Sequence, residues 1–397
     1  MATDESFLAT NPARQALLLV AMCLAAIAIR PPLTVVGPLA DMIGQQSGLP
    51  ATAIAGLTTL PLIVFVVASP LVARLAQRLV PSRLLMAGFA LMAVGSLVRW
   101  QPSLFALYAG TALIAIGIAA GNVLLPAIAR QYFPHRLGGV TSLYATLMTL
   151  AGGMGSAIAV PLAAGASLGW QATIALPGLL ALAALLAWLP LQGAQRWQTP
   201  SAQAPIYNVW RSGLAWCVAI FFGLQGMLFY SLIAWMAPML TDAGLAPETA
   251  GLVVGGFGIV GTVSSVLVPM LATRRPNQTM LAVGLGLGQL GCALGLFFAS
   301  GLVAAVFAIV FGLFSTGAFT LCFILFAVRA PTSSVSTALS GMAQSVGYAL
   351  AAAGPMVLGI AFDMTASWSS AGLAIIAMAL GTTCFGFVVG SKVIAAR

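Results

Sequence analysis

Long apolar runs alternate with short polar or Pro/Gly-rich breaks along most of the chain. A helix that crosses a membrane needs about 20 predominantly apolar residues. Twelve runs of this length lie between the breaks, at residues 16–43, 50–73, 82–100, 103–130, 137–164, 170–192, 212–240, 246–272, 277–300, 301–328, 332–362 and 366–394. The pattern therefore predicts an all-α membrane protein with twelve transmembrane helices.

The twelve runs fall into two sets of six. Residues 193–211 form a polar linker, which predicts an N-terminal six-helix bundle at 1–192 and a C-terminal bundle at 212–397. Short matches recur near a separation of 200 residues, pairing Ala55-Gly56-Leu57 with Ala250-Gly251-Leu252, Pro38 with Pro238, Pro70 with Pro269 and Arg130 with Arg329. Such a repeat predicts two pseudo-symmetric bundles that arose by duplication.

Composition and charge agree with a membrane protein. Residues of the apolar types make up 61% of the chain and charged residues 5%, against roughly 25% charged in soluble domains. The net charge of +9 does not predict a nucleic-acid partner, because the basic residues are isolated between apolar runs. The expected partners are the lipid bilayer and a small-molecule substrate.

The distribution of charges predicts the orientation. Of the 15 basic residues, all but Arg30 and Arg99 fall on the side of the amino terminus, whereas Asp41, Asp242, Glu248 and Asp363 fall on the other side. Because cytoplasmic loops collect Lys and Arg, we expect a bacterial inner-membrane protein with both termini and the linker in the cytoplasm. Met1–Gln15 has no basic region or cleavage site of a signal peptide.

Residues for metal binding or catalysis are scarce. The five cysteines lie in apolar runs without a C-x-x-C spacing, and the single histidine, His135, falls in a predicted loop. No Asp or Glu lies near the middle of an apolar run, and no G-x-x-x-x-G-K-[ST] segment occurs. We therefore expect no metal, no cofactor, no catalytic residue and no ATP hydrolysis, hence no enzyme.

Arg30 is the main candidate for substrate binding, because it lies near the middle of the first apolar run. A cation at this depth costs about 2.5–3.5 kcal/mol on insertion scales, and such residues usually serve function. The guanidinium is planar and permanently charged, so it suits an anion or a planar polar solute bound through paired hydrogen bonds. The alternative is a structural arginine that binds carbonyls freed by the neighbouring prolines.

Pro31 and Pro32 should bend or unwind the first helix beside Arg30, because neither can donate a backbone hydrogen bond. The bend could act as a gating hinge or could be static. Thr34 follows Arg30 by one turn and shares its face of the helix. Its hydroxyl could bind substrate or could bond its own backbone.

Other polar side chains near helix centres are further candidates for lining a substrate cavity: Asn122, Tyr144, Gln225, Tyr230, Gln344 and Tyr348. Gln344 and Tyr348 are four residues apart and share one helix face. For each candidate the alternative is an interhelical hydrogen bond, worth about 0.6 kcal/mol on average in membranes. Arg99, beside Trp100 at the end of the third run, is expected to extend to the membrane interface, or to attract anions at the cavity mouth.

The segment Ile29-Arg30-Pro31-Pro32-Leu33-Thr34-Val35-Val36-Gly37-Pro38-Leu39 resembles the R-P-x-L-T-x-V-G-P-L signature of the cyanate and 2-nitroimidazole transporter family, within the major facilitator superfamily. Ala234-Trp235-Met236-Ala237-Pro238 is similar to the A-W-L-P region of that family. The resemblance implies the major facilitator fold, secondary transport of small compact solutes by alternating access, and a monomer.

These observations together predict a transporter for a small anion, cyanate-like or organic, or for a nitroimidazole-like planar molecule, with Arg30 as the central binding residue. Uniport, exchange and anion–proton symport remain open as the mode of anion transport. The alternative is a drug-efflux antiporter for lipophilic compounds, although the expected buried acid is missing. A channel or a solute-sensing receptor is a further alternative, and the internal repeat favours alternating access over it.

Overall fold

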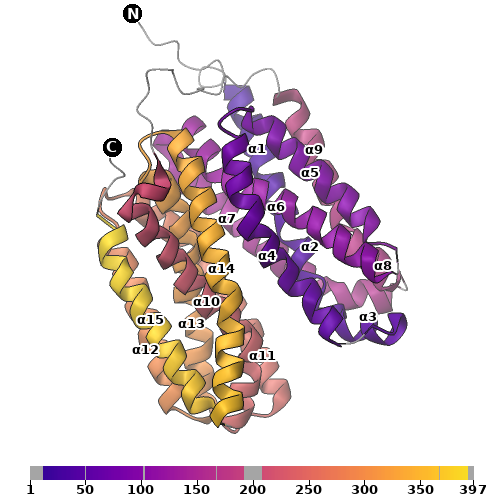
Figure 1. The fold of residues 1–397 in the computed structure, drawn as a ribbon, viewed down its shortest axis with the longest axis vertical. Helices are drawn as coiled ribbons and strands as arrows, with labels where there is room; N and C mark the ends of the chain where they lie inside the picture. Colours follow the sequence, from indigo (N-terminus) through magenta and orange to yellow (C-terminus); the bar gives the residue numbers. More distant parts are fainter. Residues whose placement is uncertain are drawn as a thin grey trace, which may run out of the picture. The chain divides into compact units, whose positions relative to one another are not determined.

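The computed structural model describes residues 12–49, 51–101, 103–166, 168–191, 208–365 and 367–391 (Figure 1). All regular elements within these ranges are helical. Twelve helical spans are long and apolar enough to cross a membrane, which confirms the predicted fold class and number of spans. Residues 193–207 of the predicted linker lie outside the described residues.

The chain divides into two compact units. The first unit contains Met1–Pro205 and the short stretch Thr332–Gly341, and the second contains Ile206–Pro331 and Met342–Arg397. Each unit therefore consists mainly of one half of the sequence, as expected from the repeat. The division at the linker into two six-helix bundles stays a prediction.

The first unit has six spans, several of which are interrupted. Its elements are α1 (Pro12–Ile29), α2 (Pro31–Thr34), η1 (Gly37–Leu39), α3 (Ala40–Ser47), α4 (Ala51–Leu75), α5 (Pro81–Val98), α6 (Leu104–Tyr132), η2 (Pro134–Arg136), α7 (Leu137–Val160), η3 (Pro161–Gly165), α8 (Gly169–Ala175), α9 (Pro177–Trp188) and η4 (Leu189–Leu191). Helices α5 and α6 pack closely where glycines face each other; a Cβ added to Gly95 would lie 2.6 Å from the carbonyl oxygen of Gly110. Small residues allow such close approach of membrane helices.

After the short 3-10 turn η5 (Val209–Arg211), the second unit contains long continuous helices: α10 (Gly213–Asp242), α11 (Pro247–Thr273), α12 (Thr279–Phe298), α13 (Gly301–Val328), α14 (Ser333–Thr365) and α15 (Trp368–Val389). The first residues of α14, up to Gly341, belong to the first unit. Helix α11 packs on α13, and α12 packs on both α13 and α15. A cluster of buried apolar side chains, including Phe257 and Phe311, fills the space between these helices.

Glycine pairs that sequence spacing alone would place in helix contacts behave differently in the two units. Gly117 in α6 lies against Gly88 and Met92 of α5, so a side chain there would collide with its neighbours. A Cβ at Gly251 or Gly255 in α11 would meet no atom within 4 Å. Close helix contact is therefore present at Gly117, whereas Gly251 and Gly255 lie on an exposed face of α11.

Candidate functional site

The first span is interrupted at Arg30, as the two prolines predict. Helix α1 ends at Ile29 and α2 begins at Pro31, with Arg30 in a bend between them. Pro31 and Pro32 have no N–H, so the carbonyls one turn earlier lose their helical donors. The half-buried Arg30 side chain consequently leaves the backbone at a discontinuity inside a 28-residue apolar span.

Helix α7 covers this break with two glycines. A Cβ at Gly152 would lie 3.2 Å from Cβ of Arg30, and a Cβ at Gly155 would lie 3.1 Å from Cα of Pro31 and from Oγ1 of Thr34. These separations are shorter than ordinary van der Waals contact, so α7 can approach the break only because both positions lack side chains. The surroundings of Arg30 and Thr34 are therefore set by α7 as well as by the prolines.

The hydroxyl of Thr34 lies within 3.4 Å of two backbone carbonyl oxygens, those of Arg30 and Pro31, and can donate to either. These long contacts correspond to the backbone-bonding alternative for this residue. Thr34 nevertheless lies beside Arg30 on the same interrupted segment and is half-buried. Its hydroxyl oxygen can still accept a hydrogen bond from a bound solute.

Arg99 does not extend to the membrane interface, which corrects the expectation from sequence. It caps the end of α5, and its side chain is 1% exposed. Nη1 donates to the carbonyl oxygen of Pro32 at 3.0 Å, and Nη2 donates to the carbonyl oxygen of Ile174 at 2.7 Å. Arg99 is thus a buried cation that is hydrogen-bonded to the backbone of the interrupted first span.

The other two candidates in the first unit are buried on α6 and α7. Asn122, 7% exposed, follows Gly121, at which a Cβ would lie 3.1 Å from Cγ1 of Ile29. The residue before Asn122 therefore packs against the end of α1. Tyr144 is 2% exposed and precedes Gly152 by eight residues on α7, about 12 Å along the helix axis.

The remaining four candidates lie on α10 and α14 of the second unit. Gln225 is fully buried, and its Nε2 donates to the carbonyl oxygen of Ser315 on α13 at 3.0 Å. This geometry is the interhelical hydrogen bond of the packing alternative. Tyr348, 4% exposed, packs edge-on against Phe222 of α10 with ring centroids 5.2 Å apart. Gln344 is fully buried one turn earlier on α14, and Tyr230 is half-buried on α10 beside Phe229.

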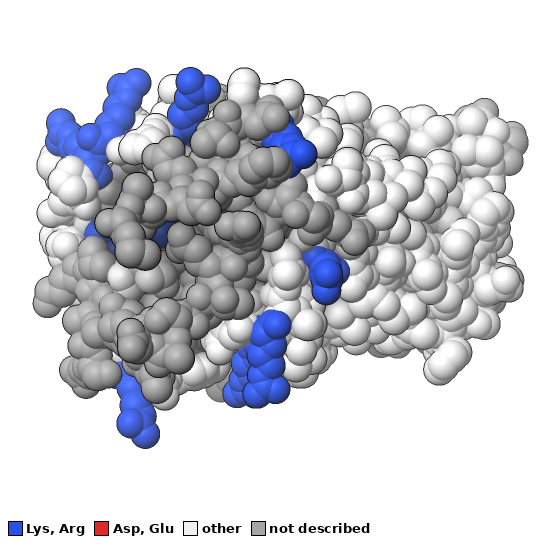
Figure 2. Space-filling model, turned by 90° about the horizontal axis from the view of Figure 1, so that it is seen from above, with Lys and Arg blue, Asp and Glu red and all other residues white. Residues whose placement is uncertain are grey.

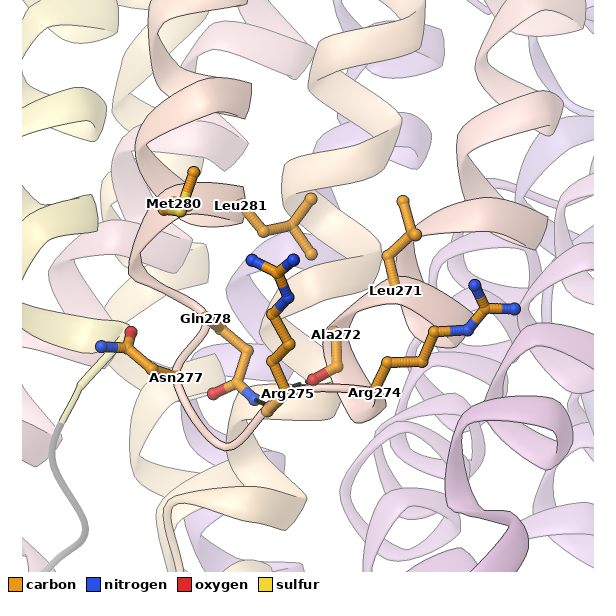
Figure 3. A pocket seen from close by; sticks show the side chains of 8 residues that line it. All are labelled: Leu271, Ala272, Arg274, Arg275, Asn277, Gln278, Met280 and Leu281. Atoms are coloured by element: carbon orange, nitrogen blue, oxygen red, sulfur yellow. Dashed lines mark hydrogen bonds between the residues drawn. The ribbon is translucent and has the colours of Figure 1, made fainter.

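A second buried arginine, Arg329, caps the end of α13 and is 2% exposed. Its Nη2 donates to Oε1 of Gln278 and to the carbonyl oxygen of Gly390. Gln278 in turn donates to the carbonyl oxygens of Ala272 at 2.7 Å and Arg275 at 2.5 Å (Figure 3). The sequence indicates only that Arg329 ends its helix on the predicted cytoplasmic side, because nothing near it in the chain indicates the groups that bury it.

A pocket of about 390 Å³ lies beside this network, between the end of α11 and the start of α12. Figure 3 shows the guanidinium of Arg275 pointing toward Leu281, while Arg274 extends the other way. The lining residues are Leu271, Ala272, Arg274, Arg275, Asn277, Gln278, Met280 and Leu281. None of the predicted substrate-binding residues lines this pocket.

His135 is exposed in η2, as expected for a solvated loop residue. Among the described residues, no group of three or more His, Cys, Asp or Glu side chains could hold a metal ion.

Twelve spans in two repeated halves, with a cation inside the first span, are the features of a secondary transporter. The sequence matches the Major Facilitator Superfamily over residues 18–355, and the chain belongs to this family. The fold agrees: a crystal structure of the Escherichia coli fucose:proton symporter aligns with a TM-score of 0.71 over 96% of this chain and 99% of that one, at 15% identity.

Curated relatives include proteins of the family indicated by the first-span signature. A 2-nitroimidazole transporter of Escherichia coli is 34% identical over 94% of this chain and 95% of its own length. An uncharacterized transporter of Bacillus subtilis is 37% identical over 86% of this chain and 85% of its own. A cyanate transport protein of Escherichia coli is 26% identical over 86% of this chain and 89% of its own. The chain is therefore a transporter of the Major Facilitator Superfamily that sits in a membrane and binds a small-molecule substrate.

Proposed function

We propose that this transporter carries a small anion, such as cyanate or a small organic anion, or a compact planar molecule of the nitroimidazole type. The substrate binds at Arg30 and crosses by alternating access. Thr34 assists Arg30, and Asn122, Tyr144, Gln225, Tyr230, Gln344 and Tyr348 are the further candidates for lining the site. Pro31 and Pro32 form the hinge of the first span.

One observation carries the proposal: a cationic side chain leaves the backbone at a break in the middle of an apolar span. Membrane proteins tolerate irregular backbone at this depth where it is buried in protein or lines a cavity. A permanently charged fork in such a place matches a carboxylate, cyanate or nitro group better than it matches a lipophilic cation. The named substrates of two curated relatives, 2-nitroimidazole and cyanate, support the same size class.

We further propose that the protein is a monomer in the bacterial inner membrane with both termini in the cytoplasm. In the view of Figure 2, the charged side chains that can be seen are Lys or Arg, and no Asp or Glu is visible. Consecutive spans run in opposite directions, so every second turn between spans lies at the same end of a unit. The exposed arginines of these turns are Arg78, Arg83, Arg136, Arg274 and Arg275. An excess of basic residues on one side supports a cytoplasmic assignment for that side.

The test is ligand-dependent thermal stabilisation of the purified protein, with cyanate, 2-nitroimidazole and, for comparison, a lipophilic cation as probes. A ligand at 100 times its Kd stabilises a protein by about 2.7 kcal/mol, which gives a measurable shift in Tm. We expect one probe to raise the Tm of the native protein. Arg30→Ala should weaken that probe about tenfold to a hundredfold, because a hydrogen bond to a charged group is worth about 1.5–3 kcal/mol. Arg30→Lys should lose most of the effect, because an ammonium cannot form the paired fork.

Arg78→Ala is the matched control, since Arg78 is an exposed arginine on a turn of the same unit. It should leave probe binding unchanged. Stabilisation that persists in both Arg30 variants would exclude the Arg30 site. Stabilisation by lipophilic cations alone would favour drug efflux.

A further inference from the structure

Arg99 is a charged residue that the proposed transport site does not use directly. It lies at the end of α5, and both of its short hydrogen bonds go to carbonyls of other elements, 67 and 75 residues away in the sequence. Its Nε is buried and has no hydrogen-bond partner among the described atoms. The guanidinium therefore donates these two hydrogen bonds to backbone positions that are distant in the sequence, and neither goes to its own helix.

Both acceptors lie where a helix is interrupted. Pro32 is in the last turn of α2, and Ile174 is in the last turn of α8, just before the second break at Leu176 and Pro177. The last carbonyls of a helix have no donor within that helix, and apolar surroundings offer none. A rigid planar fork can reach both carbonyls at once, which the single ammonium of a lysine does with poorer geometry.

The base of the Arg99 side chain is also held in place. A Cβ at Gly110 of α6 would lie 2.9 Å from Cβ of Arg99, so the two backbones are in close contact there. Helix α5 packs along α6 through such glycines and contacts α8 and α9 on another side. Arg99 thus connects a rigid helix pair to the carbonyl of Pro32, two residues after Arg30.

We propose that Arg99 is a positioning residue for the substrate site: it holds the broken segment of the first span so that Arg30 and Thr34 keep the orientation that binds the anion. The inference rests on the proposed function, because it takes Arg30 as the anion-binding group. Arg99 itself does not touch substrate. Its removal releases the carbonyl of Pro32, and the segment after the break changes its orientation against α7.

The experiment compares Arg99→Gln and Arg99→Lys with Arg329→Gln. Arg329 is the matched control, because it is an equally buried arginine that caps a helix and bonds backbone, but in the second unit. The first readout is the Kd of cyanate and of 2-nitroimidazole. We expect Arg99→Gln to raise the Kd of the bound probe about tenfold, Arg99→Lys to raise it less, and Arg329→Gln to lower Tm with Kd unchanged.

The second readout needs no ligand. Thr34→Cys in a background without native cysteines reports the exposure of the segment through its rate of reaction with a small thiol reagent. We expect Arg99→Gln and Arg99→Lys to change this rate, and Arg329→Gln to leave it unchanged, because local opening depends on local bonds. Equal loss of Tm in Arg99→Gln and Arg329→Gln, with the labelling rate and Kd unchanged, would reduce Arg99 to a stabilising residue and overturn the proposal.

The two readouts separate this proposal from the proposed function. If Arg30→Ala binds the probes as well as the native protein does, the Arg30 site is wrong, while the labelling rate still decides whether Arg99 positions the break. If Arg99→Gln does not fold, Arg99→Lys keeps the charge and supplies the same two measurements.

Discussion

The first span of each half is built differently. In the first unit this span breaks into α1, α2 and η1 at Arg30, whereas its counterpart α10 runs without interruption for 30 residues. Both contain proline, but Pro238 of α10 stands alone near the helix end, while Pro31 and Pro32 are adjacent in mid-span. A helix can stay continuous when one backbone N–H donor is missing, whereas two consecutive missing donors interrupt it.

The contrast extends to other spans. The sixth span of the first unit is divided into α8 and α9, and its fifth ends in the π-helix η3. Their counterparts in the second half of the chain, α14 and α15, are continuous. Irregular backbone within a membrane must find hydrogen-bond partners in the protein. Arg99 supplies such partners in the first unit. The difference teaches that the interrupted spans are concentrated in the first unit, and we expect this unit to dominate substrate recognition.

The largest expected effect comes from removing the break. Pro31→Ala combined with Pro32→Ala restores two donors, and each proline inside a helix costs about 3 kcal/mol. The first span should then become continuous, and the Arg30 side chain should point in a different direction. We therefore expect counterflow of the bound probe in vesicles to fall about tenfold or more. Pro238→Ala in α10 is the counterpart and should change counterflow less than about twofold. Equal effects of the two changes would contradict the difference between the halves.

An intermediate effect is expected at the glycines. Gly155→Ala places a methyl group 3.1 Å from Pro31 and Thr34, and overpacking of this kind costs about 1–3 kcal/mol, so Tm should fall. Gly255→Ala in α11 meets open space and should raise or preserve Tm, because Ala favours a helix over Gly by about 1 kcal/mol. Thermal unfolding in the same detergent measures both. A fall of Tm in both variants would mean that α7 has no special contact with the break.

The smallest effect is expected from Gln225. Gln225→Leu removes the hydrogen bond from α10 to Ser315, and such bonds in membranes are worth about 0.6 kcal/mol on average. Tm should fall slightly, and the Kd of the probe should change less than it does in Thr34→Val, which alters the segment beside Arg30. A larger loss of binding in Gln225→Leu would instead make Gln225 a substrate contact and bring the second unit into recognition.

Much of the fold is predictable because it depends on local properties. The length of each apolar run predicts a span, and the structure agrees to within a few residues for runs such as 82–100 against Pro81–Val98. The break beside Arg30 is predictable as well, since adjacent prolines cannot donate. The candidates Gln225 and Thr34 illustrate the limit: their type and depth indicate a polar contact, but only packing decides whether the partner is backbone or solute.

Three features of the sequence determined much of this protein: apolar run length gave twelve spans, the internal repeat gave two related halves, and adjacent prolines gave a break beside Arg30 in the first span. The tertiary structure alone decided what Arg99 does. The local sequence alone predicts that an arginine at a helix end extends to the membrane–water interface. It is buried instead because the carbonyls of Pro32 and Ile174, remote in sequence, lie at two helix interruptions and need the donors that a guanidinium provides.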